Sequence, residues 1–207
     1  MNKKDVSNKV PIYKLKTTDE IMQHYEEWGD KYDQDMVDWN YTAPKETVNV
    51  FKKYTTRKEI KILDAGCGTG LVGIELKKFG YTNIDGADLS KKLLNLIPKG
   101  VYKKLEQIDL NKTLNKESNI YDAVLCVGTF TFGHVKPPAL NELIRVVKNG
   151  GLICFTVNEG VYEKYGFNKK IEELTNCKSW TIKEFFKSDY IVSKDVNAWL
   201  CLAEVIK

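Results

Sequence analysis

A glycine-rich turn directly after an apolar run is the first feature of the chain that could do chemistry. Residues 61–70 read KILDAGCGTG, with Asp64 just ahead of the glycines. The spacing is G-x-G-x-G, at Gly66, Gly68 and Gly70. Glycines in such a turn let the backbone approach a ligand closely and adopt positive φ. We therefore expect this turn to hold a small molecule.

The spacing separates this turn from two common nucleotide-binding loops. A dinucleotide fingerprint, G-x-G-x-x-G, would need a glycine where Leu71 stands, and the G-K-[ST] ending of a phosphate-binding loop is absent. The Asp64 carboxylate would also repel a pyrophosphate, whereas it would attract a ligand that carries positive charge. A NAD-dependent oxidoreductase is accordingly disfavoured.

Short apolar runs rich in β-branched residues alternate with helical patterns along the chain. We expect strands near residues 60–65, 83–88, 103–108, 121–128, 152–157, 185–193 and 198–206. We expect helices near residues 70–79, 90–97, 137–148 and 160–175. This alternation predicts an α/β fold with a Rossmann-like, doubly wound, seven-stranded sheet that is mostly parallel. The last two runs have no clear helix between them, which predicts an antiparallel C-terminal hairpin closing the sheet.

The segment ahead of the first strand differs in character. Thr17 and Glu20 have the spacing of a capping box, and Pro44 suits the first turn of a second helix. After the capping box, bulky apolar residues recur near helical intervals at Ile21, Tyr25, Trp28 and Tyr32. Such a helix could be a lid over a ligand site, or it could pack its aromatic stripe on the core.

The length of 207 residues is enough for one domain with a substantial core and short for two. We expect a single domain over residues 1–207, with an N-terminal helical lid segment at 1–58 and a cofactor-binding core at 59–207. No apolar run approaches the length that spans a bilayer, and the N-terminus has no apolar signal-peptide core. We therefore expect a cytoplasmic protein. Nothing in the sequence demands a dimer, so we expect a monomer.

The composition disfavours a dedicated nucleic-acid binder and a metal enzyme. The net charge is +4, but Arg57 and Arg145 are the only arginines among 32 basic residues. Arginine is favoured where guanine or phosphate is read, and the lysines here are interleaved with acids as on a solvated surface. The five cysteines show no C-x-x-C spacing, and His24 and His134 are the only histidines. These residues leave little for a zinc site, so we expect no metal.

The run LDAGCGTG at 63–70, followed by ADLS at 87–90, resembles the class I S-adenosylmethionine-dependent methyltransferases. The resemblance covers about residues 45–160. HYEEWGDKYDQDM at 24–36, followed by YTAP at 41–44, looks more narrowly like the methyltransferase-like proteins encoded in the Williams–Beuren syndrome region. The resemblance implies S-adenosyl-L-methionine as cofactor and S-adenosyl-L-homocysteine as product.

The resemblance also implies a role for particular residues. Asp64 and the glycine loop would hold the methionine part of the cofactor, with contributions from Gly66, Cys67, Gly68, Gly70 and Leu71. Asp88 would accept hydrogen bonds from both ribose hydroxyls, which suits the two acceptor oxygens of a carboxylate. The adenine would lie among Leu89, Ile108, Asp109 and Leu110. The sulfonium would lie above Val127 and Gly128, and Tyr25 and Tyr32 would close over the methionine end.

Each of these assignments has a structural alternative. The glycine loop could be a tight turn with no ligand. Asp88 could be a helix N-cap, although Ser90 could fill that role instead. Asp109 could simply reflect how common aspartate is in turns. Tyr25 and Tyr32, with Trp28 and Tyr41, could also surround the sulfonium and attract it by cation–π interactions.

Methyl transfer from a sulfonium is a one-step displacement, so the enzyme mainly aligns the nucleophile and excludes water. Orientation of this kind can supply ~7–11 kcal/mol. His134, in the run TFTFGHV, is placed to reach the transferring methyl group and could act as a general base. The alternative is a surface-loop histidine beside Pro137 and Pro138. We expect the acceptor wall to come from residues 128–136 and 157–180, or the second stretch to be an ordinary amphipathic helix.

The leading function is a methyltransferase (EC 2.1.1.-) that modifies a small-molecule nucleophile, with nitrogen as the expected acceptor atom. The run GTFTFGH lacks the N/D-P-P-[YFW] signature of enzymes that methylate DNA, guanine in RNA or glutamine. The alternatives are a protein or RNA methyltransferase and a cofactor-binding protein without catalysis.

Overall fold

The computed structural model describes residues 6–15 and 17–207, so residues 1–5 and 16 of the expected lid segment lie outside the description. Within these residues, seven strands form one sheet in the order β3-β2-β1-β4-β5-β7-β6. The strands are β1 (Ile62–Ala65), β2 (Ile84–Asp88), β3 (Lys104–Gln107), β4 (Tyr121–Phe130), β5 (Val147–Asn158), β6 (Trp180–Ile191) and β7 (Val196–Val205). Neighbours from β3 to β5 pair in parallel, and β7 is antiparallel to β5 and β6. The predicted sheet and its C-terminal hairpin are confirmed.

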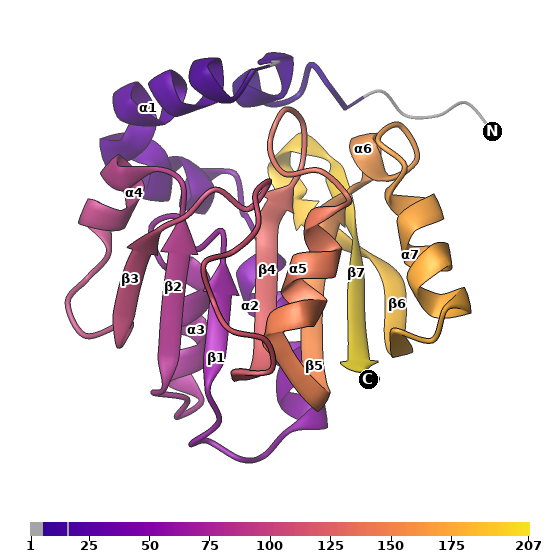
Figure 1. Ribbon diagram of the computed structural model, residues 1–207. Helices are drawn as coiled ribbons and strands as arrows, with labels where there is room; N and C mark the ends of the chain where they lie inside the picture. The colour runs from indigo at the N-terminus through magenta and orange to yellow at the C-terminus, as the bar shows by residue number, and fades with distance from the viewer. Residues whose placement is uncertain (1–5, 16) are drawn as a thin grey trace.

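Helices cover both faces of the sheet and its upper edge (Figure 1). They are α1 (Thr18–Asp38), α2 (Ala43–Tyr54), α3 (Leu71–Lys78), α4 (Lys91–Leu96), α5 (Ala139–Val146), α6 (Glu159–Tyr162) and α7 (Phe167–Asn176), with short 3-10 turns η1 (Pro11–Lys14) and η2 (Val192–Lys194). In Figure 1, α2 and α3 lie behind the sheet and α5 lies in front of it. Helix α1 crosses above the carboxyl ends of the parallel strands.

The N-terminal helices begin where the local sequence predicts. The Thr17 hydroxyl accepts a hydrogen bond from the Glu20 amide at 3.2 Å, and the Glu20 carboxylate accepts one from the Thr17 amide at 3.0 Å. This reciprocal pair satisfies two amides that helix geometry would leave without partners. Pro44 stands in the first turn of α2, where its missing N–H costs nothing. The capping box therefore fixes the residue at which α1 begins.

The central strands form the core of the sheet. All four residues of β1 are buried, and β4 is buried at every position except Asp122 and Gly128, which are partly buried. Such strands lack alternation because helices cover both of their faces. Strands β1 and β4 pair in parallel, so their carboxyl ends lie at the same edge of the sheet.

Three boundaries differ from the sequence prediction. Strand β5 begins at Val147, which pairs with Tyr121 of β4, so it starts before the predicted residue 152. The register shifts between this pair and the next one, Ala123 with Leu152. Strand β6 begins at Trp180, because the 12-residue strand pairs with β7 along its whole length. The helix predicted over 160–175 is divided into α6 and α7, because Gly166 adopts a left-handed φ of 82° between them.

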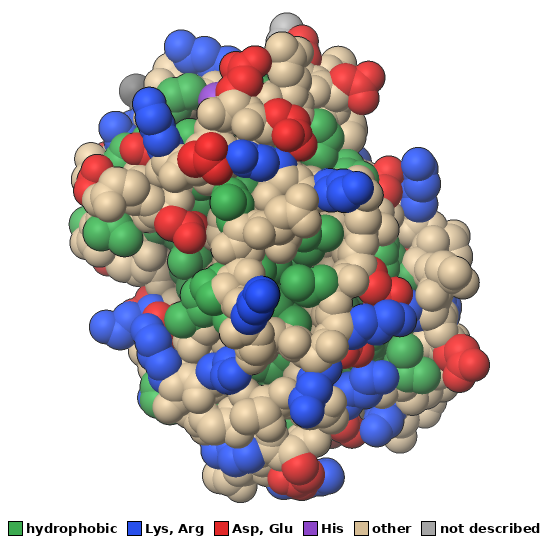
Figure 2. Space-filling model, turned by 90° about the vertical axis from the view of Figure 1, so that its left-hand side faces the viewer, with side chains coloured by type: hydrophobic (Ala, Val, Ile, Leu, Met, Phe, Trp, Pro, Cys, Tyr) green, Lys and Arg blue, Asp and Glu red, His purple; other side chains and the backbone are tan. Residues whose placement is uncertain are grey.

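The surface seen from the β3 edge carries both signs of charge. Figure 2 shows lysine or arginine side chains interspersed with aspartate or glutamate over this face. Among the described residues, no helix combines the length and the apolar character needed to cross a bilayer. Nor do those residues contain a cluster of three histidine, cysteine or acidic side chains suited to a metal ion.

Candidate active site

A cavity of about 90 Å³ lies at the carboxyl ends of the parallel strands. Its walls come from the glycine loop, the ends of β2 and β4, and the facing side of α1. Eleven of the fifteen predicted cofactor-binding residues line it: Tyr25, Tyr32, Gly66, Gly68, Asp88, Leu89, Ile108, Asp109, Leu110, Val127 and Gly128. His134 lines it as well. Among the described residues, Asp64, Cys67, Gly70 and Leu71 lie outside this lining.

The glycine loop has the conformation that its spacing predicts. Gly66, Gly68 and Gly70 have φ values of 78°, 52° and 93°, all in the left-handed region. A Cβ on Gly66 would lie 2.0 Å from the Thr129 hydroxyl oxygen, so packing against β4 excludes any side chain there. A Cβ on Gly68 would meet nothing closer than Leu93 at 4.0 Å, which leaves its backbone exposed to the cavity.

Asp88 links the glycine loop to α4. One carboxylate oxygen accepts a hydrogen bond from the Gly68 amide at 2.8 Å, and the other accepts one from the Ser90 amide at 2.8 Å. Ser90 itself caps α4, since its hydroxyl accepts from the Leu93 amide at 3.2 Å. Burial raises the pKa of Asp88, while these backbone hydrogen bonds oppose the shift. Asp88 is thus fixed at the cavity wall without serving as the side-chain cap of α4.

Asp64 is fully buried beneath the glycine loop. The Tyr102 hydroxyl donates a hydrogen bond to its Oδ2 at 2.5 Å, and Oδ1 has no hydrogen-bond partner among the described residues. Burial raises the pKa of Asp64 to about 7, although the Tyr102 hydrogen bond acts in the opposite direction. A buried carboxyl with an unpartnered oxygen is costly, and a cation would relieve that cost.

Tyr102 is a residue that the sequence analysis missed. Its ring occupies the space beside Gly73 and Gly86, where an added Cβ would lie 2.5 Å and 3.1 Å from the ring respectively. An isolated glycine inside a helix pattern, or inside a strand pattern, indicates close approach of another group. Gly73 in α3 and Gly86 in β2 were therefore the available signal, but neither glycine identifies which side chain approaches.

The opposite wall of the cavity comes from the residues that directly follow β2 and β3 in the chain. Leu89, Ile108 and Leu110 contribute apolar surface there. Asp109 accepts a hydrogen bond from the Asn111 amide at 2.9 Å and pairs with Lys112 at 3.4 Å. Asp109 therefore has the turn geometry that aspartate commonly adopts, and it also lines the cavity.

Helix α1 closes the cavity from above. Tyr25 and Tyr32 line the cavity, and Trp28 packs against Tyr32 with ring centroids 4.8 Å apart. The helix is tied to α4 by an ion pair between Asp30 and Lys92 at 2.8 Å. The aromatic stripe thus packs on itself and also lines the cavity.

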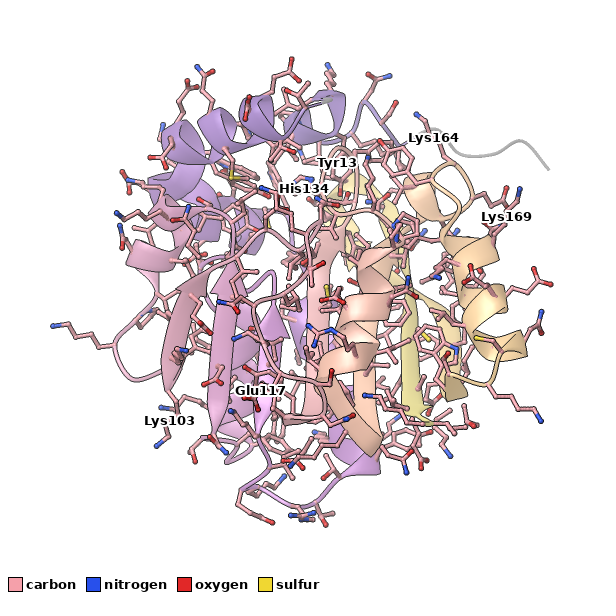
Figure 3. The ribbon with its side chains drawn as sticks, in the orientation of Figure 1. Tyr13, Lys103, Glu117, His134, Lys164 and Lys169 are labelled. Carbon is pink, nitrogen blue, oxygen red and sulfur yellow. The ribbon has the colours of Figure 1, made fainter. Side chains whose placement is uncertain are left out.

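His134 contacts the lid through Tyr25. The His134 Nδ1 atom lies 2.6 Å from the Phe132 carbonyl oxygen, which can only accept, so Nδ1 carries the proton. Burial lowers the pKa of His134 to about 4, which keeps the ring neutral near neutral pH. Nε2 therefore accepts the hydrogen bond from the Tyr25 hydroxyl at 2.9 Å. Figure 3 shows His134 beneath α1, on the same side as Tyr13.

A second cavity of about 40 Å³, which we call the aromatic cavity, adjoins the first. Four residues line both: Tyr25, Tyr32, Gly128 and His134. The remaining lining residues are Val10, Ile12, Tyr13, Trp28, Met36, Trp39, Tyr41, Thr131, Tyr190 and Ile191. Among the described residues that line it, none is acidic and none is a lysine or arginine.

Distant segments build the aromatic cavity. Tyr41 reaches it because its backbone bridges to Ile191 at the end of β6, and the neighbouring Thr42 amide donates to the Tyr190 carbonyl at 3.1 Å. The rings of Tyr41 and Tyr190 pack edge to face at 5.1 Å. Gly128 lies beneath them with a φ of 79°, and a Cβ there would lie 2.6 Å from the Tyr41 hydroxyl. The sequence analysis missed Tyr13 and Tyr190, because Tyr13 comes from η1 and Tyr190 from β6, far apart in the chain.

The stretch 157–180, expected to help form an acceptor wall, makes side-chain contacts with the C-terminal hairpin. Tyr162 packs on Trp199 with ring centroids 5.0 Å apart, and Glu159 pairs with Lys187 at 2.7 Å. None of its described residues lines either cavity. The alternative, an ordinary helical segment on the sheet, is the one that the structure has.

Comparisons with known proteins agree with this geometry. A family profile described as a methyltransferase domain matches residues 62–151. The chain is 31% identical to human methyltransferase-like protein 27, over 77% of this chain and 67% of that protein. It is 30% identical to a glycine/sarcosine N-methyltransferase of Halorhodospira halochloris, over 59% of this chain and 47% of that protein. The chain therefore spans about two thirds of the first relative and about half of the second.

Solved structures show the same fold. A SAM-dependent methyltransferase from Aquifex aeolicus superposes with a TM-score of 0.57 at 17% identity, covering 77% of this chain and 89% of that one. The similarity to the human relative extends over most of both chains, and the cavity lies at the glycine loop. Sequence and structure therefore point to the same family. The chain belongs to the class I S-adenosylmethionine-dependent methyltransferases.

Proposed function

We propose that the enzyme transfers a methyl group to a nitrogen atom of a small molecule that enters the aromatic cavity. The observation that carries this proposal is the junction of the two cavities at Gly128, Tyr25, Tyr32 and His134. A cofactor in the first cavity and an acceptor in the second would face each other there. In the family, the cofactor supplies a methyl group made electrophilic by its sulfonium.

The residues around the first cavity fit this cofactor. The unpartnered, buried oxygen of Asp64 suits an ammonium group, and the carboxylate of Asp88 suits two ribose hydroxyls. We assign the adenine surroundings to Leu89, Ile108, Asp109 and Leu110, and the sulfonium surroundings to Val127 and Gly128. Tyr25 and Tyr32 would cover the methionine end. Gly66, Cys67, Gly68, Gly70 and Leu71 would shape the loop, with Cys67, Gly70 and Leu71 acting from behind the wall.

The lining of the aromatic cavity supports a nitrogen acceptor. Methylation of an amine produces positive charge on nitrogen, and aromatic rings attract a desolvated cation by roughly 2 kcal/mol. Tyr41 and Tyr190 supply such rings, and burial raises the pKa of each hydroxyl well above its ordinary value, so both stay neutral. Without a basic side chain in its described lining, the cavity would not welcome a substrate carboxylate.

The size and position of the aromatic cavity favour a small molecule. A space of about 40 Å³ under α1 and η1 suits a compact group better than a polymer. The mixed charge in Figure 2 offers nucleic acid no continuous basic track on that face. We propose that the lid segment 1–58 and the core 59–207 act as one methyltransferase domain, as a monomer in the cytoplasm.

Incubation with methyl-labelled S-adenosylmethionine and a cell extract tests the proposal. After separation into small molecules, protein and RNA, we expect the label in the small-molecule fraction, on nitrogen. The Asp88→Ala variant is the matched control, because it should lose the cofactor and all labelling. Label in protein or RNA would overturn the small-molecule assignment. Cofactor binding without any labelled product would favour a protein that has lost catalysis.

A further inference from the structure

We infer that Tyr25 is the residue that takes the proton of the acceptor nucleophile and passes its own proton to His134. This inference rests on the proposed function, because it needs an acceptor in the aromatic cavity. It changes the expected roles of both residues. His134 becomes a positioning residue and final proton holder, and Tyr25 becomes the catalytic group that touches the substrate.

Both ring nitrogens of His134 already have a hydrogen-bond partner. Its Nδ1 proton is donated to the Phe132 carbonyl at 2.6 Å, and its Nε2 lone pair accepts from the Tyr25 hydroxyl at 2.9 Å. A substrate proton therefore cannot reach the imidazole directly while α1 is closed. The Tyr25 hydroxyl occupies the Nε2 lone pair, and both residues line both cavities, so an incoming N–H group can bond to the Tyr25 oxygen instead.

The Tyr25 hydroxyl can only accept a hydrogen bond from a ligand. Because its single proton is committed to His134, its oxygen presents only lone pairs to the junction of the two cavities. Such an oxygen accepts a hydrogen bond from an N–H or O–H group of the ligand, but it cannot donate one to a carbonyl oxygen. Tyr25 thereby selects an acceptor nitrogen that still carries hydrogen, and the hydrogen bond directs the nitrogen lone pair away from the tyrosine.

The proton balance of the step is complete. The nitrogen lone pair forms a bond to the methyl carbon, and the carbon–sulfur bond breaks with its electron pair staying on sulfur. The nitrogen proton moves to the Tyr25 oxygen as the Tyr25 proton moves to His134 Nε2. The imidazolium that results keeps its hydrogen bond to Phe132 and releases its proton to water when the product leaves.

The surroundings of His134 favour rapid resetting. Burial is the main reason for its lowered pKa, the hydrogen bond to Phe132 opposes the shift, and the nearby charge of Lys136 adds to it. No acidic group is among the main influences on its pKa. The imidazolium is thus a short-lived species that loses its proton readily once water returns.

Two pairs of variants test the inference. Tyr25→Phe keeps the ring over the cofactor and removes the hydroxyl, and His134→Asn removes the imidazole. Tyr54→Phe and His24→Asn are the matched controls, since the Tyr54 hydroxyl bonds to Glu184 at the surface and neither residue lines either cavity. All are produced as the full chain.

The first measurement needs no acceptor. Nitrogen NMR of the histidines, with S-adenosylhomocysteine present, should show His134 as the neutral Nδ1–H form, with an Nε2 resonance that moves in Tyr25→Phe and not in Tyr54→Phe. A proton on Nε2, or an Nε2 resonance that ignores the Tyr25 substitution, would overturn the inference. This result is independent of whether any methyl acceptor is found.

The second measurement uses the extract fraction that the wild-type enzyme labels. Single-turnover transfer should fall at least about 100-fold in Tyr25→Phe and in His134→Asn, the usual scale of general acid–base assistance. Affinity for S-adenosylhomocysteine by calorimetry should stay within about threefold. Undiminished transfer in Tyr25→Phe refutes the proton route. Absence of any labelled fraction contradicts the proposed function alone, because the NMR result reads the pair directly.

Discussion

The Thr69 hydroxyl in the glycine loop donates a hydrogen bond of 2.5 Å to Asp33 on α1. Thr69 is buried, with 2% of its surface exposed, so this contact joins the glycine loop directly to α1. The Asp30–Lys92 ion pair joins the same helix to α4 further along. The position of α1 is therefore coupled to the conformation of the glycine loop.

Removing the Thr69 hydroxyl should loosen the lid. Thr69→Val keeps the shape of the side chain and deletes one hydrogen bond to a charged group, so we expect S-adenosylhomocysteine to dissociate about tenfold faster. Stopped-flow fluorescence of α1 tryptophan measures this rate. Asp38→Asn is the control, because Asp38 bonds only to Gln34 on the same helix among the described contacts. Equal release rates for Thr69→Val and wild type would argue against a latch.

Asp88→Asn should weaken the cofactor specifically. The variant keeps the volume but replaces one acceptor oxygen with a donor, at a carboxylate that already receives two backbone amides. A loss of about 1.5–3 kcal/mol, or roughly 10- to 100-fold in affinity, is expected by calorimetry.

Asp85→Asn on the same strand is the matched control for Asp88. Asp85 is buried and accepts a hydrogen bond from Tyr121 at 3.0 Å, away from the cavity. Its loss should lower the melting temperature and leave cofactor affinity within about twofold. If both variants lost affinity equally, Asp88 would be a structural residue of β2 and not a cofactor ligand.

The glycine-loop wall of the first cavity could be predicted because its signals are local. The spacing of Gly66–Gly70 and the position of Asp88 at the end of β2 are each readable within about ten residues, and the parallel sheet brings the two strand ends to one edge. The capping box at Thr17 is local in the same way. Local chemistry therefore predicted both the start of the lid and the glycine-loop wall.

The aromatic cavity could not be predicted, because its residues are distant in the chain. Tyr13 comes from η1 and Tyr190 from β6, and residue 41 reaches the cavity by bridging to the end of β6. The sequence pattern instead favoured Tyr162, which packs on the C-terminal hairpin. Tyrosine and tryptophan suit core, lid and binding site alike, so their type alone does not choose among these positions.

Gly128→Ala tests the boundary between the two cavities. The new Cβ would lie 2.6 Å from the Tyr41 hydroxyl, at a φ of 79° that disfavours alanine by about 1–2 kcal/mol. Gly166→Ala is the matched control, since its φ is 82° and nothing lies within 4 Å. Both should lose stability from strain, measured by urea unfolding, but only Gly128→Ala should lose methyl transfer. Full transfer by Gly128→Ala would place the acceptor elsewhere.

Asp64 should make the unliganded protein less stable as pH rises. Burial raises its pKa to about 7 from the ordinary 3.8, so between these values the folded state holds a proton that the unfolded state has lost. Its contribution is complete below the unfolded pKa and is lost as pH rises through the folded one, by up to about 4 kcal/mol. Asp64→Asn should therefore gain stability relative to wild type on going from about pH 4 to pH 8, measured by urea unfolding.

His134 should act with the opposite sign over nearly the same window. Burial lowers its pKa from 6.5 to about 4, so its contribution is complete above the unfolded pKa and is lost as pH falls through the folded one, by up to roughly 3 kcal/mol. The stability of His134→Asn relative to wild type should thus decline as pH rises from about 4 to 6.5, while that of Asp64→Asn increases. Because the two contributions offset each other in wild type, its own stability curve hides both. A flat trend in either variant would show that its side chain is solvated and not buried as the structure places it.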